Sequence, residues 1–436
     1  MRKFLLMLGL IAMVAVSCDK DPVVIQVPIQ LTMDGNPFAM EGVTVSLTST
    51  NATLEAQTDA SGLVSFVIPV GNYTASASFK KAEAGIMMNY NGTATVNVVD
   101  LGKGSTFPTV PLALTASKSS QLIIKELYNG GCADNAGKLY QYDKYIIVYN
   151  NSDTEVDASK MCLAMAQILN TTATNKYVIT DGVIEYETAG WVPASYGIWW
   201  FQDGVSVKIA PYSQIVISIN GAVDHTATYT NSVDLSKADY CLYDLESGFN
   251  AAAHYPAPAA SVPTSHYMKT VEFGMGTAWA FPNKNAAPML LMPDQDIKAF
   301  VADPANFDNK GNNNSSNYAK VPIPWVLDAM EIWSSPDETK YFRRLPNVID
   351  NGYVVMETSG QGHSWYRNVD KAATEAIEGN AGKLVYNYAG AVDASATDPS
   401  GIDAEASIAA GAKIVYSDSN NTAKDFHFRN VASLKK

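Results

Sequence analysis

The chain has 436 residues, of which 47% are hydrophobic and only 17% are charged, and its formal net charge at pH 7 is −13. A charged fraction this far below the usual ~25% describes a body that is polar mainly through uncharged groups. The negative charge repels phosphate backbones, so nucleic acid is excluded as a partner. Beyond the leader, no apolar run approaches the ~20 residues that a membrane-spanning helix needs.

The first eighteen residues are typical of a bacterial lipoprotein signal. A short cationic start precedes an apolar run that ends at Val16, and one small residue, Ser17, separates this run from Cys18. The run is too short to span a bilayer, and its flanks are those of a cleaved export signal. We therefore expect residues 1–17 to be removed and Cys18 to be lipidated. The alternative is an ordinary secretory signal with an incidental cysteine.

Residues 18–22 form a short acidic tether, in which Asp19, Lys20 and Asp21 follow the cysteine. This tether resembles the tag that sends lipoproteins of Bacteroidota to the cell surface. The resemblance implies an outer-membrane protein that is anchored by its lipid and exposed outside. Because each buried methylene adds ~0.8 kcal/mol, an anchor with several acyl chains is effectively permanent. In other bacteria Asp19 would indicate retention at the inner membrane.

Cysteine usage excludes a disulfide scaffold. Apart from Cys18 the chain contains Cys132, Cys162 and Cys241, an odd number that allows at most one disulfide. Cysteines and histidines show no metal-ligand spacing, so we expect no metal and no cofactor.

The segment 23–115 alternates apolar and polar residues between closely spaced turns. Val43, Val45 and Leu47 share one face of a predicted strand, and the turn Thr58–Gly62 leads to a second strand, Leu63–Pro69. Short strands separated by Asp, Asn and Gly predict a small β-sandwich.

The same segment resembles the carboxypeptidase-regulatory or collagen-adhesin-B type of prealbumin-like domain. The hallmark of that family is a T-D-x-x-G turn, then an aromatic-bearing strand and a G-x-Y strand, here Thr58, Asp59, Gly62, Phe66, Gly71 and Tyr73. The resemblance implies a stalk or spacer, with carbohydrate binding as an alternative. We find no matched partners for the Lys–Asn crosslink of some relatives.

The region 120–436 is predicted to be a second β-rich body. It resembles the lamin-tail domain, an immunoglobulin-like sandwich, in a strand, a turn and a proline-led strand at Lys144–Asn150, Val156–Met161 and Ala210–Ile219. Strands are also expected at Gly352–Met356 and Gly382–Tyr386, and helices at Pro293–Asp303 and Asn368–Glu378. The pattern leaves open whether this body is one sandwich or two subdomains that break near residues 282–320.

The order of these segments resembles a Bacteroidota surface lipoprotein family of unknown function, which pairs an N-terminal prealbumin-like domain with a lamin-tail-like body. In such organisms, surface lipoproteins commonly act as capture proteins for TonB-dependent outer-membrane transporters. The resemblance therefore implies location and architecture, and a transporter as the expected partner.

Aromatic residues suggest where a ligand would bind. Trp191, Tyr196 and Trp200 lie in one stretch, and we identify them as candidate binding residues. Because successive side chains of a strand point to opposite faces, Trp199 and Phe201 are expected in the core, with Trp200 facing the other way. Core packing of the whole stretch is the alternative. The polar loop Ala305–Lys320 is a second candidate for recognition.

No catalytic constellation is evident, and we expect no enzyme. Nucleophilic hydrolysis would need a histidine base beside a serine or cysteine, but the histidines are scattered and no G-x-S-x-G elbow is present. A pair of acids for glycoside hydrolysis leaves no spacing to detect. The acids in apolar context are Asp328, Glu331 and Glu357.

Taken together, the sequence predicts an all-β protein of tandem β-sandwiches with little helix. The expected function is capture of an extracellular ligand, with a glycan, a peptide and an iron compound left open. Adhesion without a small ligand is the alternative, and an all-β hydrolase is weaker still, since sandwich folds host many functions.

Overall fold

The computed structural model describes residues 24–435, with gaps at 50–51, 84–85, 103–106, 168–176, 178–183, 245, 248–254, 272, 274–280, 310–316 and 338–340. The predicted leader, Cys18 and the acidic tether lie outside the described residues. The chain divides into two compact units, Met1–Ser78 with Asn91–Leu114 and Phe79–Tyr90 with Thr115–Lys436. Strands dominate both, so the predicted all-β class is confirmed.

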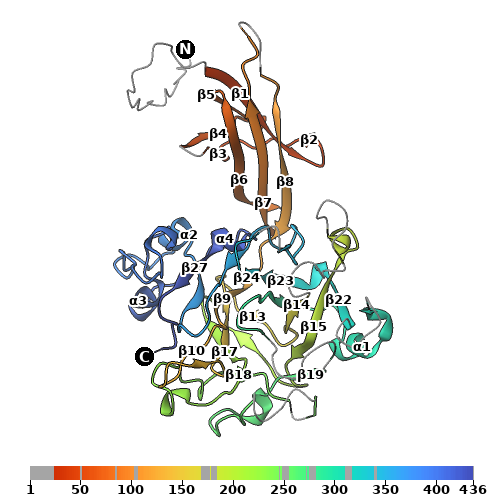
Figure 1. Ribbon diagram of the computed structural model, residues 1–436, viewed down its shortest axis with the longest axis vertical. Coiled ribbons are helices and arrows are strands. Elements are labelled where there is room, and N and C mark those ends of the chain that lie inside the picture. Colours follow the sequence, from red (N-terminus) through yellow and green to blue (C-terminus); the bar gives the residue numbers. More distant parts are fainter. Residues whose placement is uncertain are drawn as a thin grey trace. The chain divides into compact units, whose positions relative to one another are not determined.

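The first unit is built on eight strands in the order β2-β1-β8-β7-β6-β3-β4, with β5 paired to β1 (Figure 1). β1 runs antiparallel to β5 and parallel to β8. The strands are β1 (Val24–Met33), β2 (Asn36–Pro37), β3 (Thr44–Thr48), β4 (Thr53–Gln57), β5 (Leu63–Pro69), β6 (Gly71–Glu83), β7 (Ile86–Val98) and β8 (Val110–Lys118).

Alternating burial in these strands produces the core of the first unit. In β3 the side chains of Val45 and Leu47 are fully buried. In β5 Val64, Phe66 and Ile68 are buried, while Ser65, Val67 and Pro69 are exposed. Because these strands bury alternate side chains, the buried apolar residues form a core on one face of the sheet. The period-2 alternation predicted for these strands is thus observed.

The predicted turn between β4 and β5 is held by Asp59. Its carboxylate accepts hydrogen bonds from the backbone N–H groups of Ser61 (2.8 Å) and Leu63 (3.1 Å) and from the Ser61 hydroxyl (2.6 Å). These bonds, that of the Ser61 hydroxyl first, lower the pKa of Asp59. Gly62 adopts φ +79°, a left-handed conformation that favours glycine.

The second unit contains a six-stranded sheet in the order β18-β17-β12-β9-β26-β27. Two of its strands come from the C-terminal part of the sequence, since β26 pairs with β9 and β27 pairs with β26. The strands are β9 (Leu122–Tyr128), β12 (Tyr145–Asn150), β17 (Gln214–Ser218), β18 (Tyr240–Cys241), β26 (Ser364–Arg367) and β27 (Phe426–Arg429).

A seven-stranded sheet faces it, in the order β21-β22-β15-β14-β20-β23, with β19 paired to β15. Its strands are β14 (Cys162–Ala166), β15 (Trp191–Trp200), β19 (Lys269–Val271), β20 (Pro288–Leu291), β21 (Phe307–Asn309), β22 (Asn317–Pro322) and β23 (Val326–Ala329). Two-stranded sheets are formed by β10 (Cys132–Ala133) with β11 (Leu139–Tyr140), β13 (Val156–Asp157) with β16 (Lys208–Ile209), and β24 (Ile332–Trp333) with β25 (Val354–Val355).

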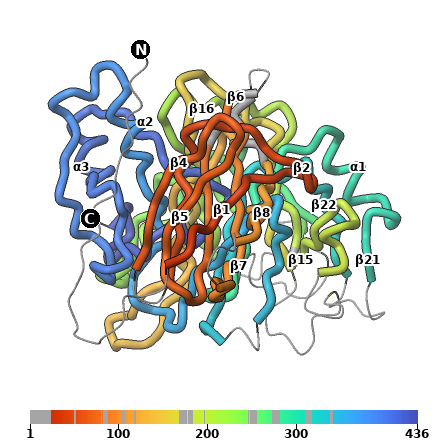
Figure 2. Tube along the Cα trace, turned by 90° about the horizontal axis from the view of Figure 1, so that it is seen from above, coloured from red at the N-terminus to blue at the C-terminus, as the bar shows by residue number. Residues whose placement is uncertain are grey.

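The main core of the second unit lies between the two large sheets. Ile124 of β9 and Val148 of β12 are buried there with Leu163 of β14, Trp199 of β15 and Leu290 of β20. The outer faces are covered as well, because further apolar clusters lie beyond each sheet. In Figures 1 and 2, α2 and α3 lie at one side of this unit and α1 at the other.

The helices are short, and each α-helix begins after an Asp or Asn side chain that accepts a hydrogen bond from a backbone N–H of its first turn. They are α1 (Ile297–Ala302), α2 (Lys371–Glu375), α3 (Ala404–Ala409) and α4 (Thr422–Asp425). Single 3-10 turns occur at η3 (Glu185–Glu187), η4 (His225–Ala227), η5 (Thr264–His266), η6 (Pro304–Asn306), η8 (Ile323–Trp325) and η9 (Ala394–Ala396).

Some expectations for the C-terminal half are confirmed and others are corrected. α1 and α2 fall inside the two predicted helices. The segment 382–386 is not a strand, because only Tyr386 forms a bridge, to Ile402. The strands β20, β22 and β23 share one sheet, so the second unit does not break near 282–320. No helix among the described residues is long and apolar enough to cross a membrane.

Candidate binding site

The strand β15 sends its last aromatic residues to opposite faces, as predicted. Trp199 and Phe201 are buried in the main core. Trp200 points to the outer face of the seven-stranded sheet, where it is only partly buried. On the neighbouring strand β19, Lys269 pairs directly with Trp200. This register brings a charged side chain beside the tryptophan.

A hollow of about 530 Å³ opens beside Trp200. It lies on the second unit, where the ends of β15 and β19 meet the first turn of α1. Its size falls within the ~300–1,000 Å³ range of small-molecule sites. The walls combine one tryptophan with acidic, basic and amide groups, and the lining residues are Trp200, Gln202, Asp203, Asp244, Glu246, Ser247, Lys269, Thr270, Val271 and Lys298.

Asp244 organises one wall of this hollow. Its side chain is 4% exposed, and its carboxylate accepts hydrogen bonds from the backbone N–H of Thr270 (3.0 Å) and from Nζ of Lys269 (3.1 Å). Lys269 Nζ also lies 3.3 Å from Glu246. Desolvation lowers the pKa of Lys269, but the hydrogen bonds and charges of Asp244 and Glu246 outweigh it and raise that pKa. The lysine is therefore held as a cation between two carboxylates.

A second ion pair stands on the opposite wall. Lys298, in the first turn of α1, lies 2.7 Å and 2.9 Å from the two carboxylate oxygens of Asp203. Both side chains are largely exposed, and the hydrogen bond to Asp203 raises the pKa of Lys298. The hollow thus contains three carboxylates and two ammonium groups, which leaves it nearly neutral.

A mainly apolar hollow of about 410 Å³, whose wall also includes Asn309 and Asn317, shares Val271 with the charged one. Phe273 and Phe307 stand in its wall with ring centroids 5.1 Å apart and planes at 78°. Val301, Ala302 and Pro304 line the side toward α1. A ligand that crossed Val271 would contact charged groups at one end and an apolar surface at the other.

Of the other two candidate residues, Trp191 does not join this site. Trp191 stands at the opposite end of β15, nine residues away, which corresponds to roughly 30 Å of extended strand. Its ring packs against Tyr177 and Tyr186, each with its centroid 5.7 Å away. Tyr196 belongs to β15, but its side chain lies outside what the structure describes. Trp200 therefore borders the hollow and Trp191 does not.

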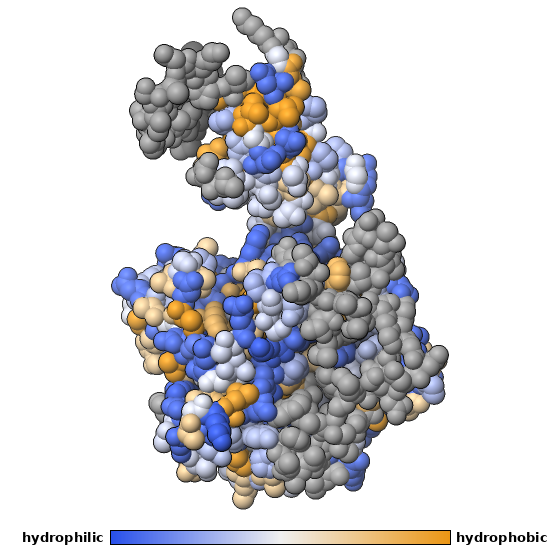
Figure 3. All heavy atoms as spheres, in the orientation of Figure 1, coloured by the Kyte–Doolittle hydropathy of each residue, from blue (hydrophilic) through white to orange (hydrophobic). Residues whose placement is uncertain are grey.

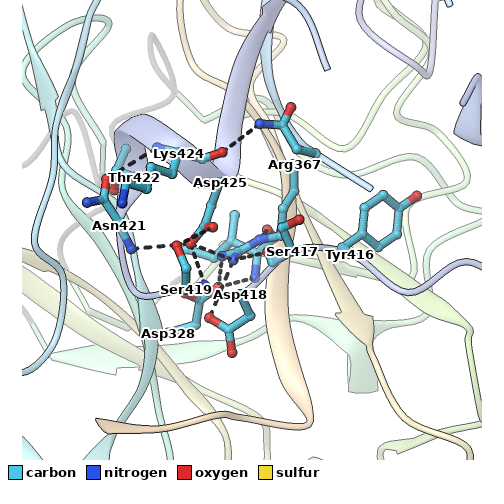
Figure 4. Close-up of polar contacts among 12 residues, drawn as sticks. Asp328, Arg367, Tyr416, Ser417, Asp418, Ser419, Asn421, Thr422, Lys424 and Asp425 are labelled. Atoms are coloured by element: carbon cyan, nitrogen blue, oxygen red, sulfur yellow. Dashed lines mark hydrogen bonds and ion pairs between the residues drawn. The ribbon is translucent and has the colours of Figure 1, made fainter. Parts of the chain in front are cut away.

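Acids that the sequence places in apolar context serve another purpose. Asp328 is ion-paired with Arg367, which is 1% exposed and also lies 3.6 Å from Asp418 and 3.8 Å from Asp425 (Figure 4). Burial raises the pKa of Asp328 in spite of the guanidinium. These contacts join β23 and β26 to the segment that follows Tyr416. Similarly, the fully buried Glu331 is ion-paired with Arg344.

His225 and the three described thiols are likewise buried inside the fold. His225 contacts the Tyr140 hydroxyl and the Gly221 carbonyl, each at 2.7 Å. Cys132, Cys162 and Cys241 are free and buried. Within the described ranges, no group of three or more His, Cys, Asp or Glu side chains is arranged to hold a metal ion.

Sequence reasoning missed most walls of the hollow. Asp203, Asp244, Lys269 and Lys298 are scattered over nearly a hundred residues, so no spacing connects them. A weak signal was present at Gln202 and Asp203, since a polar turn directly after an aromatic strand places such groups near its last outward side chain.

The fold and the hollow define an all-β protein with an open surface site on its larger unit. The chain is similar over residues 210–387 to a family described as a protein of unknown function, DUF4876. A solved DUF4876 family protein from Bacteroides thetaiotaomicron VPI-5482 is 21% identical, with a TM-score of 0.51, and the match covers 92% of this chain and 94% of that one. This likeness shows a shared fold.

A DUF3823 family protein from Parabacteroides merdae ATCC 43184 also matches, with 13% identity and a TM-score of 0.18, over 43% of this chain and 92% of that one. The comparison with curated proteins finds no match. The expected similarity to a Bacteroidota family of unknown function is found in the DUF4876 matches.

Proposed function

We propose that this protein is a lipoprotein of the outer-membrane surface that captures a neutral oligosaccharide in the hollow beside Trp200 and passes it to an outer-membrane transporter. The location rests on the leader and on Cys18. The similarity to a Bacteroides protein supports it, because surface export of this kind is expected in Bacteroidota.

The observation that carries the proposal is the outward Trp200 ring beside ion-paired carboxylates. An indole offers a flat apolar face on which a sugar ring can stack. Carboxylates and amides around it can accept and donate hydrogen bonds, which fix the orientation of hydroxyl groups. Because Lys269 and Lys298 already neutralise two of the three acids, the hollow favours a neutral polar ligand over an anion.

Binding is proposed rather than catalysis. A glycoside hydrolase needs two carboxyl groups that face the substrate, one of them with a raised pKa. Among the acids of the hollow, Asp244 is held by Lys269 and by the Thr270 N–H, while Glu246 and Asp203 are largely exposed. The buried acids with a raised pKa lie elsewhere: Asp328 and Asp425 in the ion-pair cluster of Arg367, and Asp350 and Asp398 outside that cluster.

The test is calorimetric titration of residues 19–436 with a panel of neutral oligosaccharides, followed by the best ligand on two variants. Trp200→Ala should weaken affinity at least ~10-fold, equivalent to ~1.4 kcal/mol. Trp191→Ala changes a tryptophan at the far end of the same strand and should leave affinity unchanged. Equal loss in both variants would contradict the site, and no binding across the panel would favour adhesion.

A further inference from the structure

Five exposed apolar side chains of the first unit gather at one end. Among the described residues, its exposed large apolar side chains are Leu54 of β4 (42%) and a group of five, Val24 (54%), Val67 (61%), Val70 (46%), Val99 (44%) and Leu101 (39%). We call these five residues the entry-end patch. Single exposed apolar residues are normal on a protein surface, but a contiguous group indicates an interaction site.

Strand register places the five together. Val24 is the first residue of β1 and pairs with Pro69, the last residue of β5, so Val67 and Val70 flank it. β6 begins at Gly71 and is joined to β7 by two residues, so these neighbouring strands form a hairpin. The end of β7 therefore lies beside the start of β6, which brings Val99 and Leu101 to the same end. Figure 3 shows a hydrophobic area on this unit.

The opposite end of the first unit is polar. It carries the turns at Asp34–Gly35, Glu41–Gly42 and Asp59–Gly62, whose acidic side chains are exposed. Leu31 near the end of β1 donates its N–H to Gly62, which confirms that these turns lie away from Val24. The two ends of the same sandwich thus differ sharply in polarity, and this difference calls for a partner at the apolar end.

The chain itself indicates that partner. Val24, inside the patch, is only six residues from Cys18. A fully extended chain spans at most ~3.6 Å per residue, so the patch lies within roughly 20 Å of the cysteine. If Cys18 carries the lipid, as the proposed function requires, the acyl chains are in the bilayer and the patch cannot leave its surface.

We propose that the entry-end patch rests on the phospholipid surface, with Val67 and its neighbours in the headgroup region. Apolar side chains at such an interface gain by leaving water. Five side chains are few for binding from solution, but the anchor makes the contact intramolecular and raises its effective concentration. Docking then fixes the orientation of the first unit, so that its polar turns point away from the membrane.

The experiment uses a fluorescent NBD label on a cysteine introduced at position 67 or at Ala60, which lies in the polar turn of the opposite end. The native thiols are buried and should stay unlabelled. The lipidated full chain is reconstituted into phosphatidylethanolamine and phosphatidylglycerol vesicles that contain a nitroxide-labelled quencher lipid. We expect a blue shift and strong quenching at position 67, and neither at position 60. Equal responses at the two positions would overturn the proposal.

Two controls separate this contact from the anchor on which it depends. In the first control, a protein that is not lipidated will not float with the vesicles, and this result identifies a failed anchor. In that case an N-terminal histidine tag bound to nickel-chelating lipid tethers residues 19–436 at the same point. Val70→Ser with Val99→Ser should reduce quenching at position 67. Val431→Ser, an equally exposed valine of the second unit, should not, and unchanged quenching in the double variant would contradict the patch.

Discussion

Nε of Arg344 lies 2.7 Å from Oε1 of Glu331, and neither side chain is exposed to solvent. The carboxylate and the guanidinium also form hydrogen bonds with backbone groups. Glu331 accepts the backbone N–H groups of Arg344 (2.8 Å) and Leu345 (3.1 Å), and the guanidinium donates to the carbonyls of Ala286 (3.0 Å) and Ile332 (2.8 Å). The ion pair and its hydrogen bonds thus connect three segments of the second unit, at Ala286, at residues 331–332 and at residues 344–345.

Removing one partner of this pair should be costly. Glu331→Ala leaves a buried guanidinium without its counter-charge, so the free energy of unfolding of the second unit should fall by ~3–5 kcal/mol. Urea unfolding followed by circular dichroism measures it. The matched control is Glu155→Ala, which breaks the exposed pair with Lys208 and should cost no more than ~1 kcal/mol. Similar losses in both variants would show that the buried pair contributes no more to the free energy of unfolding than the exposed pair does.

His427 should make the second unit sensitive to acid. Desolvation, and then the charge of Arg429, lower the pKa of this histidine to about 3. The unfolded chain titrates near 6.5, so it binds more protons than the folded chain between those values, and stability falls as the pH drops from 6.5 to 3. His427→Gln should flatten this slope by up to ~1.4 kcal/mol per pH unit. A slope identical to that of the wild type in urea unfolding at pH 4, 5, 6 and 7 would refute the assignment.

The three thiols should be unreactive until the protein unfolds. Desolvation raises the pKa of Cys132 and of Cys241 to about 12 and also raises the pKa of Cys162. Because the thiolate is the nucleophile, a colorimetric disulfide reagent at pH 8 should find no reactive thiol among them in the folded chain. In guanidinium all three should react. A rapid native reaction would mean that one of these sites opens.

Gly62 and Gly35 offer a matched pair for backbone effects in the first unit. Both have φ near +78°, but an added Cβ at Gly62 would overlap the carbonyl oxygen of Phe38, whereas nothing lies within 4 Å at Gly35. Gly35→Ala should cost ~1–2 kcal/mol from the left-handed conformation alone. Gly62→Ala should cost a further ~1–3 kcal/mol from the clash. Calorimetry of the two variants checks the difference, and equal melting shifts would argue against a rigid turn.

Local patterns in the sequence predict much of this fold. Alternation in β3 and β5, the Asp59 turn, and the opposed faces of Trp199 and Trp200 follow from period-2 geometry, which acts within a few residues. The strand predicted at 382–386 does not form. Leu384 packs against the cluster of Tyr149, Tyr366 and Tyr416 without entering a sheet, so the apolar residues of this segment indicate packing and not strand pairing. Propensity was overridden by tertiary context.

The site was less accessible to prediction. Trp200 could be identified because its neighbours are aromatic, but the residues that give the hollow its charge come from separate strands and from α1. The same holds for Lys125, which is 1% exposed, pairs with Glu405 at 2.8 Å and lies 5.5–5.9 Å from three tyrosine rings. Only the folded chain brings such groups together, so their spacing in the sequence does not predict that they are neighbours.

The pairing of β26 with β9, and of β27 with β26, has a consequence for biosynthesis. β9 is made early and can pair with β12 soon afterwards, but its other neighbour, β26, emerges from the ribosome more than two hundred residues later. The nascent chain therefore keeps one edge of β9 unpaired until β26 is made. This state is compatible with secretion in an unfolded form, but it increases the risk of aggregation. A polypeptide truncated before residue 426 would lack β27, and we expect quality-control proteases to remove it.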